Sequence, residues 1–195
     1  WRDGTGSLGR MAEKPVIPVI RAEDSRLKAL VSDWLNDNLK PSVNMIVIEG
    51  LPCSGKSTLQ ANLSIDDAYK FELDQYLPSP CSAETKWIDH ILQSKAIRDI
   101  ENSCAARSRT LIEGPAAGLL LQELSPKPDR QNILRIYIKE MSTSGGQITW
   151  FGHEFLKDFA AERRPFWKSI YDHHHVDKPW MQADLVVERI PEENE

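Results

Sequence analysis

The apolar residues of this 195-residue chain follow two spacings, short continuous runs and three- and four-residue steps, which are typical of buried strands and amphipathic helices. Five strands are predicted, at residues 45–48, 68–74, 110–113, 133–138 and 183–187. A first helix is expected to start at Asp24 or Ser25 and to stop before Pro41. Further helices are expected from about Lys56, over 83–107, over 116–124 and as two stretches within 151–172.

The alternation of strands and helices predicts an α/β fold, a three-layer sandwich in which a five-stranded parallel sheet has helices on both faces. The extra N-terminal helix is expected to pack outside the sheet. Ligands in such folds bind at the carboxyl ends of the strands. Residues 50–58, Asp74 and Glu113 follow or end three predicted strands, so we expect them at one edge of the sheet.

Length and composition predict one globular domain over residues 21–190, with 41% hydrophobic and 27% charged residues. Residues 1–20 are predicted to be a flexible leader, in which 1–10 are either part of that leader or an expression remnant ahead of Met11, and 191–195 an acidic tail. A net charge of −5 without a basic run disfavours a nucleic-acid partner. The absence of a long apolar run and the three widely spaced cysteines favour a cytoplasmic protein without membrane contact.

The most specific signal is GLPCSGKST at 50–58, which matches the phosphate-binding pattern G-x-x-x-x-G-K-[ST]. Its glycines let backbone N–H groups turn toward phosphate oxygens. Lys56 would bring a charge to the β- and γ-phosphates, and the Ser57 hydroxyl would ligate Mg²⁺. A chance match is disfavoured because an apolar strand precedes the segment and helical spacing follows it. The expected nucleotide-binding residues are Gly50, Pro52, Cys53, Ser54, Gly55, Lys56, Ser57 and Thr58.

Three further features favour phosphoryl transfer to an alcohol. Asp74, at the end of a predicted strand, is a candidate to accept the proton of an attacking hydroxyl; the alternative is a capping role. Glu113 also ends a strand and is a candidate Mg²⁺ ligand, direct or through water, rather than a surface carboxylate. Arg163 and Arg164 lie in a helical stretch before Pro165, where they would stabilise transferring charge or simply be solvated.

Two other classes of nucleotide-binding protein fit the sequence less well. A GTPase is expected to carry the guanine-reading motif N-K-x-D, which this chain lacks. A motor ATPase is expected to have an apolar strand ending in Asp or Asp-Glu, whereas the candidate strand in this chain reads LIEG. The chain is also short for such machines. A small-molecule kinase is therefore the favoured class.

In their order along the chain these motifs resemble the uridine kinase-like branch of the P-loop kinases, which includes nucleoside, pantothenate and phosphoribulose kinases. The resemblance covers about residues 45–188 and rests on GLPCSGKST, LDQY, LIEG and ERR, followed by Tyr171, His175, Pro179 and Ala183-Asp184. It implies the P-loop NTPase fold of that branch. It also implies that Asp74 contacts and deprotonates the acceptor hydroxyl. By the same resemblance Glu113 would help to hold Mg²⁺–ATP, and Arg163 and Arg164 would contact phosphates.

We therefore expect an ATP- and Mg²⁺-dependent kinase that moves the γ-phosphoryl group of ATP to a hydroxyl of a small metabolite. A nucleoside or a sugar-like alcohol is the favoured acceptor. Two alternatives stay open: a kinase of nucleotides or polynucleotide 5′ ends, and a non-catalytic ATP-binding regulatory protein. The expected partners are ATP and the small acceptor, and a homodimer is compatible with this hypothesis.

Histidines and tryptophans give weaker signals. The adjacent His173, His174 and His175 predict a partly exposed turn rather than a metal site, because consecutive side chains diverge. Trp34 and Trp87 fall on helical apolar stripes and are expected in the core. Three tryptophans lie in less regular stretches, where one of them is a candidate to stack on a base or sugar: Trp150, Trp167 and Trp180.

Overall fold

A computed structural model describes residues 16–106, 109–144, 147–150 and 164–190. The strands in this part are β1 (Val19–Glu23), β2 (Met45–Gly50), β3 (Ala68–Glu72), β4 (Arg109–Gly114), β5 (Ile133–Ser144), β6 (Gln147–Trp150) and β7 (Leu185–Ile190). The α-helices are α1 (Asp24–Asn38), α2 (Lys56–Asn62), α3 (Trp87–Gln93), α4 (Ala96–Ala105), α5 (Ala117–Leu120) and α7 (Pro165–Asp172). Single turns of other helix types are η1 (Leu73–Tyr76), η2 (Arg130–Asn132), η3 (His173–Asp177) and η4 (Pro179–Met181). None of the helices in the described ranges has the length and apolar content that crossing a membrane requires.

The strands form one sheet in the order β1-β7-β5-β2-β4-β3, with every neighbouring pair in this order parallel. The end of β5 also pairs antiparallel with β6. The predicted α/β fold with a parallel sheet is therefore confirmed. The predicted count of five strands is wrong, because the described part of the chain contributes seven.

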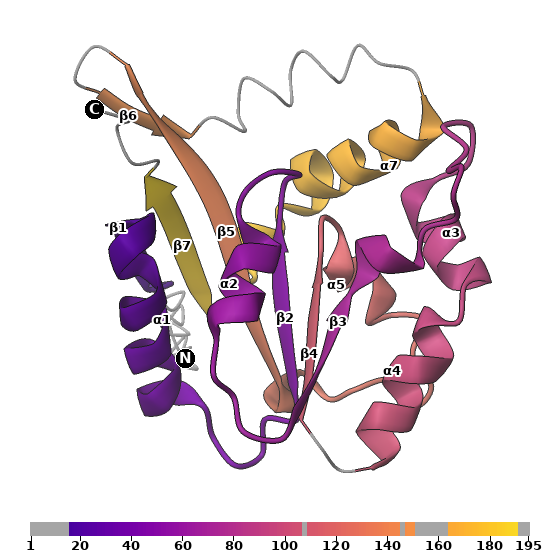
Figure 1. Ribbon diagram of the computed structural model, residues 1–195, viewed down its shortest axis with the longest axis horizontal. Helices are drawn as coiled ribbons and strands as arrows, with labels where there is room; N and C mark the ends of the chain where they lie inside the picture. The colour runs from indigo at the N-terminus through magenta and orange to yellow at the C-terminus, as the bar shows by residue number, and fades with distance from the viewer. Residues whose placement is uncertain (1–15, 107–108, 145–146, 151–163, 191–195) are drawn as a thin grey trace, which may run out of the picture.

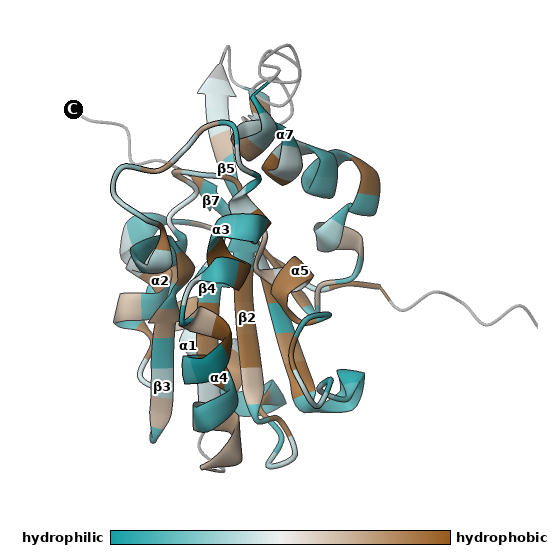
Figure 2. Cartoon of the chain, turned by 90° about the vertical axis from the view of Figure 1, so that its right-hand side faces the viewer, coloured by the Kyte–Doolittle hydropathy of each residue, from teal (hydrophilic) through white to brown (hydrophobic). Residues whose placement is uncertain are grey.

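Helices cover both faces of this sheet and complete three layers (Figure 1). On one face, α1 and α2 pack on side chains that include Ile46 and Ile48 of β2. On the other face, α3, α4, α5 and α7 pack on side chains that include Met45 and Val47. All six residues of β2 are buried, and Figure 2 shows this strand in brown in the interior. Burial on both faces explains why β2 reads as a continuous apolar run.

The strand order reverses next to β2, and this reversal defines where a ligand fits best. The chain leaves β2 toward β3 through α2, whereas it leaves the adjacent β4 for β5, on the other side of β2. Ligands of parallel α/β folds bind at the carboxyl ends of strands at such a reversal. Residues 50–58 follow β2 and Glu113 belongs to the end of β4, so the fold brings both to this place.

Several element boundaries differ from the prediction. The single helix expected over 83–107 is divided into α3 and α4 at Ser94, whose hydroxyl donates to the Ile91 carbonyl (2.6 Å) and accepts from the Ala96 N–H (3.1 Å). These side-chain hydrogen bonds replace backbone bonds of a continuous helix. The helix expected over 116–124 is shortened to α5, and β5 runs past the predicted residue 138 into the hairpin with β6.

The N-terminal part of the domain starts earlier than predicted. Strand β1 begins at Val19, inside the segment 1–20 that was expected to be a flexible leader, and pairs with β7 at the edge of the sheet. Helix α1 follows it and buries Leu27, Val31 and Leu35 on the face that it shares with α2. Strand β1 and helix α1 are thus part of the packed domain.

Leu35→Ala tests this packing, because the Leu35 side chain is only 4% exposed. Removing its buried methyl groups should lower the free energy of unfolding by about 2–5 kcal/mol, measured by urea denaturation. Leu92→Ala is the control, since Leu92 is 37% exposed and should cost much less. Equal losses in the two variants would mean that α1 is not packed as described.

Candidate active site

The GLPCSGKST segment spans the last residue of β2, the connecting loop and the first turn of α2, and its backbone disfavours side chains at two positions. A Cβ added to Gly50 would lie 2.5 Å from the carbonyl oxygen of Ile138 in β5. Gly55 precedes α2 with φ +90°, a conformation that glycine adopts without the usual steric cost. Cys53 also has a positive φ, 65°. The helix expected from about Lys56 is confirmed as α2.

Lys56, the first residue of α2, is only 6% exposed, and its ammonium group donates a hydrogen bond to the Leu51 carbonyl (2.9 Å) within the same loop. Burial lowers the pKa of Lys56, while the charges of Glu113 and Asp74 act in the opposite direction. An ammonium group has three N–H donors, and one of them is used in the described structure. The group therefore has donors left for an anion at the loop.

Glu113 at the end of β4 faces this loop and accepts a hydrogen bond from the Ser57 hydroxyl (2.9 Å). Its side chain is nearly fully buried, and burial raises its pKa although Lys56 and Ser57 oppose that shift. Among the described residues, nothing hydrogen-bonds to its second carboxylate oxygen or to the buried Ser54 hydroxyl. Buried polar atoms normally have partners. A hydroxyl and a carboxylate with a free buried oxygen suit Mg²⁺, which prefers oxygen ligands.

Asp74 lies at the same end of the sheet but on η1, not at the end of a strand as predicted, because β3 ends at Glu72. Buried Leu73 anchors this turn against Gly114, where an added Cβ would be 3.0 Å from the leucine side chain. The exposed Asp74 carboxylate accepts a hydrogen bond from the indole N–H of Trp87 (3.1 Å). Trp87 is in the core as predicted, but it also orients Asp74, which its helical spacing did not indicate.

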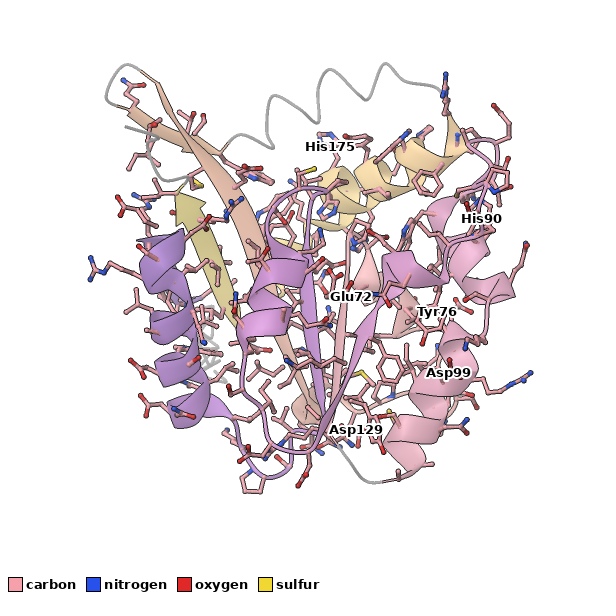
Figure 3. The ribbon with its side chains drawn as sticks, in the orientation of Figure 1. Glu72, Tyr76, His90, Asp99, Asp129 and His175 are labelled. Carbon is pink, nitrogen blue, oxygen red and sulfur yellow. The ribbon has the colours of Figure 1, made fainter. Side chains whose placement is uncertain are left out.

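Three segments are joined beside Asp74: η1, the start of α3 and helix α7. The Trp87 backbone N–H donates to the Ser169 hydroxyl (3.1 Å), and the Phe166 N–H donates to the Ala83 carbonyl (3.1 Å). On η1 itself, the Tyr76 hydroxyl donates to Asp99 of α4 (3.2 Å), a pair labelled in Figure 3. Helix α7 is therefore attached directly to the segment that follows Asp74.

The two arginines are only partly placed. Arg164 is exposed and immediately precedes α7, and its side chain has no hydrogen bond or ion pair within the described residues. Arg163 lies outside the described residues. Figure 1 shows α7 at the same end of the sheet as the 50–58 loop. The structure thus brings Lys56, Ser57 and Glu113 together, but it does not bring Arg164 into contact with them.

The expectation of a partly exposed histidine turn is wrong for two of the three residues. His173 and His174 are buried, at 7% and 0% exposure, and only His175, labelled in Figure 3, is exposed. His173 contacts Glu49 of β2, whose carboxylate is also buried. The sequence held a signal for this contact, because a glutamate inside the apolar run MIVIEG needs a buried partner. That signal was not used in the prediction.

His174 is held between two other groups. Its Nε2–H donates to the Pro115 carbonyl (2.5 Å), so its Nδ1 accepts a hydrogen bond from the Tyr137 hydroxyl (2.8 Å). Burial lowers the pKa of His174 to about 4, although the charge of Glu49 and the hydrogen bond to Pro115 oppose the shift. The residue is therefore neutral at physiological pH and serves as a packed hydrogen-bonding group behind the loop.

Tyr137 is also the centre of an aromatic cluster. The rings of Trp150 and Trp180 lie 5.0 Å apart and both contact Tyr137, and the Lys139 ammonium lies 5.1 Å from the Trp150 ring. Two of the three tryptophans considered for base stacking thus pack against each other. Stacking on a ligand stays a prediction for all three.

The cavities that stand out among the described residues lie elsewhere. One of about 630 Å³ is lined by Asn44 and Arg109, and another of about 650 Å³ by Glu101 and Asn132. Both are at the amino ends of the strands, opposite to the 50–58 loop. The buried charges and unpartnered oxygen atoms gather at the carboxyl ends, so we place the candidate site there on chemical grounds.

The lowered pKa of His174 predicts a loss of stability in acid. The unfolded chain takes up this proton near pH 6.5, whereas the folded chain does so only near pH 4, so stability falls as pH decreases between these values. The difference in unfolding free energy between the wild type and His174→Gln should shrink over this range by as much as about 3 kcal/mol. Urea denaturation at a series of pH values measures it. His175→Gln should behave like the wild type, and a pH-independent difference for His174→Gln would contradict the burial described.

Comparison of the chain with protein-family models, with curated proteins and with solved structures gave no significant match. The family resemblance of the motifs therefore stays a prediction. The function proposed below is supported by the residues of this chain and by their geometry.

Proposed function

We propose that this protein is an ATP- and Mg²⁺-dependent P-loop kinase that transfers the γ-phosphoryl group of ATP to a hydroxyl of a small metabolite. The observation that carries the proposal is the contact between Ser57 and the buried Glu113 beside buried Lys56, at the point where the strand order reverses. Lys56 and Ser57 belong to a glycine-rich segment whose sequence matches the phosphate-binding pattern.

Phosphate binding is assigned to the loop and to Lys56. Gly50 lets the start of the loop pack closely on β5, and Gly55 supplies the positive φ before α2; in this backbone the loop N–H groups are proposed to bind phosphate oxygens. Lys56 keeps its charge buried beside the loop, where attraction for an anion is stronger than in water. The low exposure of Lys56 supports a binding role over a role in solubility.

Mg²⁺ binding is assigned to Ser57 and Glu113. Their oxygen atoms are within hydrogen-bond distance of each other, and the second oxygen of Glu113 is buried without a partner in the described residues. When bound, the ion would neutralise charge on the phosphate groups. The raised pKa of Glu113 reflects a buried carboxylate that a cation would stabilise in its charged form.

Proton transfer from the acceptor is assigned to Asp74. Its carboxylate is exposed to an incoming molecule, while the Trp87 indole N–H holds its orientation. A carboxylate so placed can accept the proton of an attacking hydroxyl. A nucleoside or sugar-like alcohol is the acceptor class that we favour. Arg163 and Arg164 are proposed to contact phosphates during transfer, on the sequence pattern alone.

Lys56→Ala should abolish binding of Mg²⁺–ATP and phosphoryl transfer, because the variant loses the buried cation of the loop. Isothermal titration calorimetry with Mg²⁺–ATP measures binding directly. Lys95→Ala is the matched control, since the Lys95 side chain is 75% exposed and lies outside the 50–58 segment. Unchanged ATP binding in Lys56→Ala would refute the assignment of the loop.

Asp74→Asn should lower the rate of transfer by about 10²–10⁴-fold, the usual contribution of a general base, and leave the affinity for Mg²⁺–ATP nearly unchanged. The rate is followed with labelled ATP and a panel of nucleosides and sugars as acceptors. Glu72→Gln is the control, because Glu72 lies two residues before Asp74 and accepts a hydrogen bond from Gln75. Full activity of Asp74→Asn would refute its role. ATP binding by the wild type without transfer to any acceptor would favour the regulatory alternative.

A further inference from the structure

Glu49 directly precedes the 50–58 loop and is a charged side chain buried in the central strand, at 4% exposure. Its Oε1 accepts hydrogen bonds from the Gly118 backbone N–H (2.9 Å) and from Nε2 of His173 (2.7 Å). Gly118 belongs to α5, which follows β4, and His173 begins the turn η3, which follows α7. One carboxylate therefore joins the strand that leads into the 50–58 segment to the helix after β4 and to the turn after α7.

The ring of His173 lies between two carboxylates. Its Nε2 is 2.7 Å from Glu49 and its Nδ1 is 2.9 Å from Asp177. A carboxylate can only accept, so both contacts are hydrogen bonds only when both ring nitrogens carry a proton. A neutral imidazole has one N–H and would leave a lone pair facing the other carboxylate. The geometry thus selects the charged form of His173.

We infer that the Glu49–His173–Asp177 chain positions α5 and the end of α7 against the phosphate-binding loop, and that this tie holds only while His173 is protonated. Loss of that proton to solvent should weaken nucleotide binding at the loop. The inference rests on the proposed function, because it takes the 50–58 loop to bind phosphate. Glu49 and His173 are positioning residues here, since neither is assigned a contact with the reacting atoms.

The sign of the effect follows from charge. Protonated His173 balances the buried negative charge of Glu49, and that charge acts on Lys56 inside the same site. Without the proton, the surroundings of the loop become more negative by one unit, which disfavours anionic phosphate. The loosened contact with Asp177 acts in the same direction, because it frees the turn after α7.

The other groups packed around Glu49, His173 and Asp177 do not supply a proton in place of the one on His173. Burial keeps the adjacent His174 neutral, and the Gly118 amide, which donates to Glu49, does not titrate near neutral pH. The remaining groups that interact electrostatically with Glu49 come from α2 and β5: burial lowers the pKa of Lys56 and of Arg135 and raises the pKa of Tyr137. His173 differs from these groups because it contacts both Glu49 and Asp177, so a change at Asp177 acts on His173 and separates its titration from that of Lys56.

Burial by itself would lower the pKa of His173, but the hydrogen bonds and charges of Glu49 and Asp177 outweigh it and raise the pKa above 6.5. Because the folded-state pKa is raised, the contribution of the pair is complete below pH 6.5 and is lost as the pH rises through the folded pKa. Nucleotide affinity should therefore fall on the alkaline side.

The test is the affinity for Mg²⁺–ATP, measured by calorimetry from about pH 6 to about pH 9, a range that spans a raised histidine pKa. The wild type should lose affinity on the order of tenfold across this range. By reciprocity, binding near the midpoint should be accompanied by proton uptake, which titrations in buffers of different ionisation enthalpy measure. His173→Gln should bind with neither the pH dependence nor the proton uptake.

Asp177→Asn is the second variant, because the Asp177 side chain is half-exposed and its replacement leaves the buried residues in place. It should move the midpoint of the pH dependence to lower pH, an effect that a purely structural role of the turn would not produce. This variant decides the matter if His173→Gln fails to fold. His175→Gln, which changes an exposed neighbouring histidine, should keep the wild-type profile.

The two proposals fail in different ways. If the wild type does not bind Mg²⁺–ATP at any pH, the proposed function is overturned, and this inference with it. If the wild type binds but its affinity is independent of pH, or Asp177→Asn leaves the midpoint unchanged, only the role of His173 is overturned.

Discussion

The structure depends on the burial of β2 on both faces. Side chains such as Ile46 and Val47 exclude water along the strand, so a charge on it must be compensated locally. Glu49, near the carboxyl end, meets this requirement through an amide and a histidine ring. The loop that follows Gly50 is held just as closely, because the Ile138 carbonyl leaves no space for a side chain there. Burial of one strand thus determines where the polar groups of the domain gather.

The carboxyl edge of the sheet consequently has a high density of buried charge. Lys56, Glu113, Glu49 and His173 are each less than 10% exposed, and burial lowers the pKa of Lys56 although the charges of the two glutamates oppose that shift. Isolated charges of this kind would be costly to bury, so their clustering is the economical arrangement. Such a cluster of buried charges is also unusual where side chains only pack together. The cluster therefore supports a binding site for a charged ligand.

Sequence patterns were sufficient for the fold class and for the edge at which Lys56, Ser57 and Glu113 meet, because long apolar runs and a glycine-rich motif are strong local signals. They failed for β1 and β6, since VIRAE and QITW are short and bury few side chains. They also failed for His173 and His174, whose burial depends on contacts more than a hundred and some forty residues away, respectively. Contacts of that separation leave no local periodicity.

The close packing of Glu49 and Gly118 has an evolutionary consequence. A Cβ at position 118 would lie 3.0 Å from one carboxylate oxygen of Glu49 and 3.2 Å from the other. A side chain at position 118 would therefore push the Glu49 carboxylate aside, and a shorter residue at position 49 would relieve this crowding but leave the histidine ring without its buried partner. Substitutions at positions 49, 118 and 173 should therefore be coupled, and related sequences are expected to keep these three residues together or to change them together.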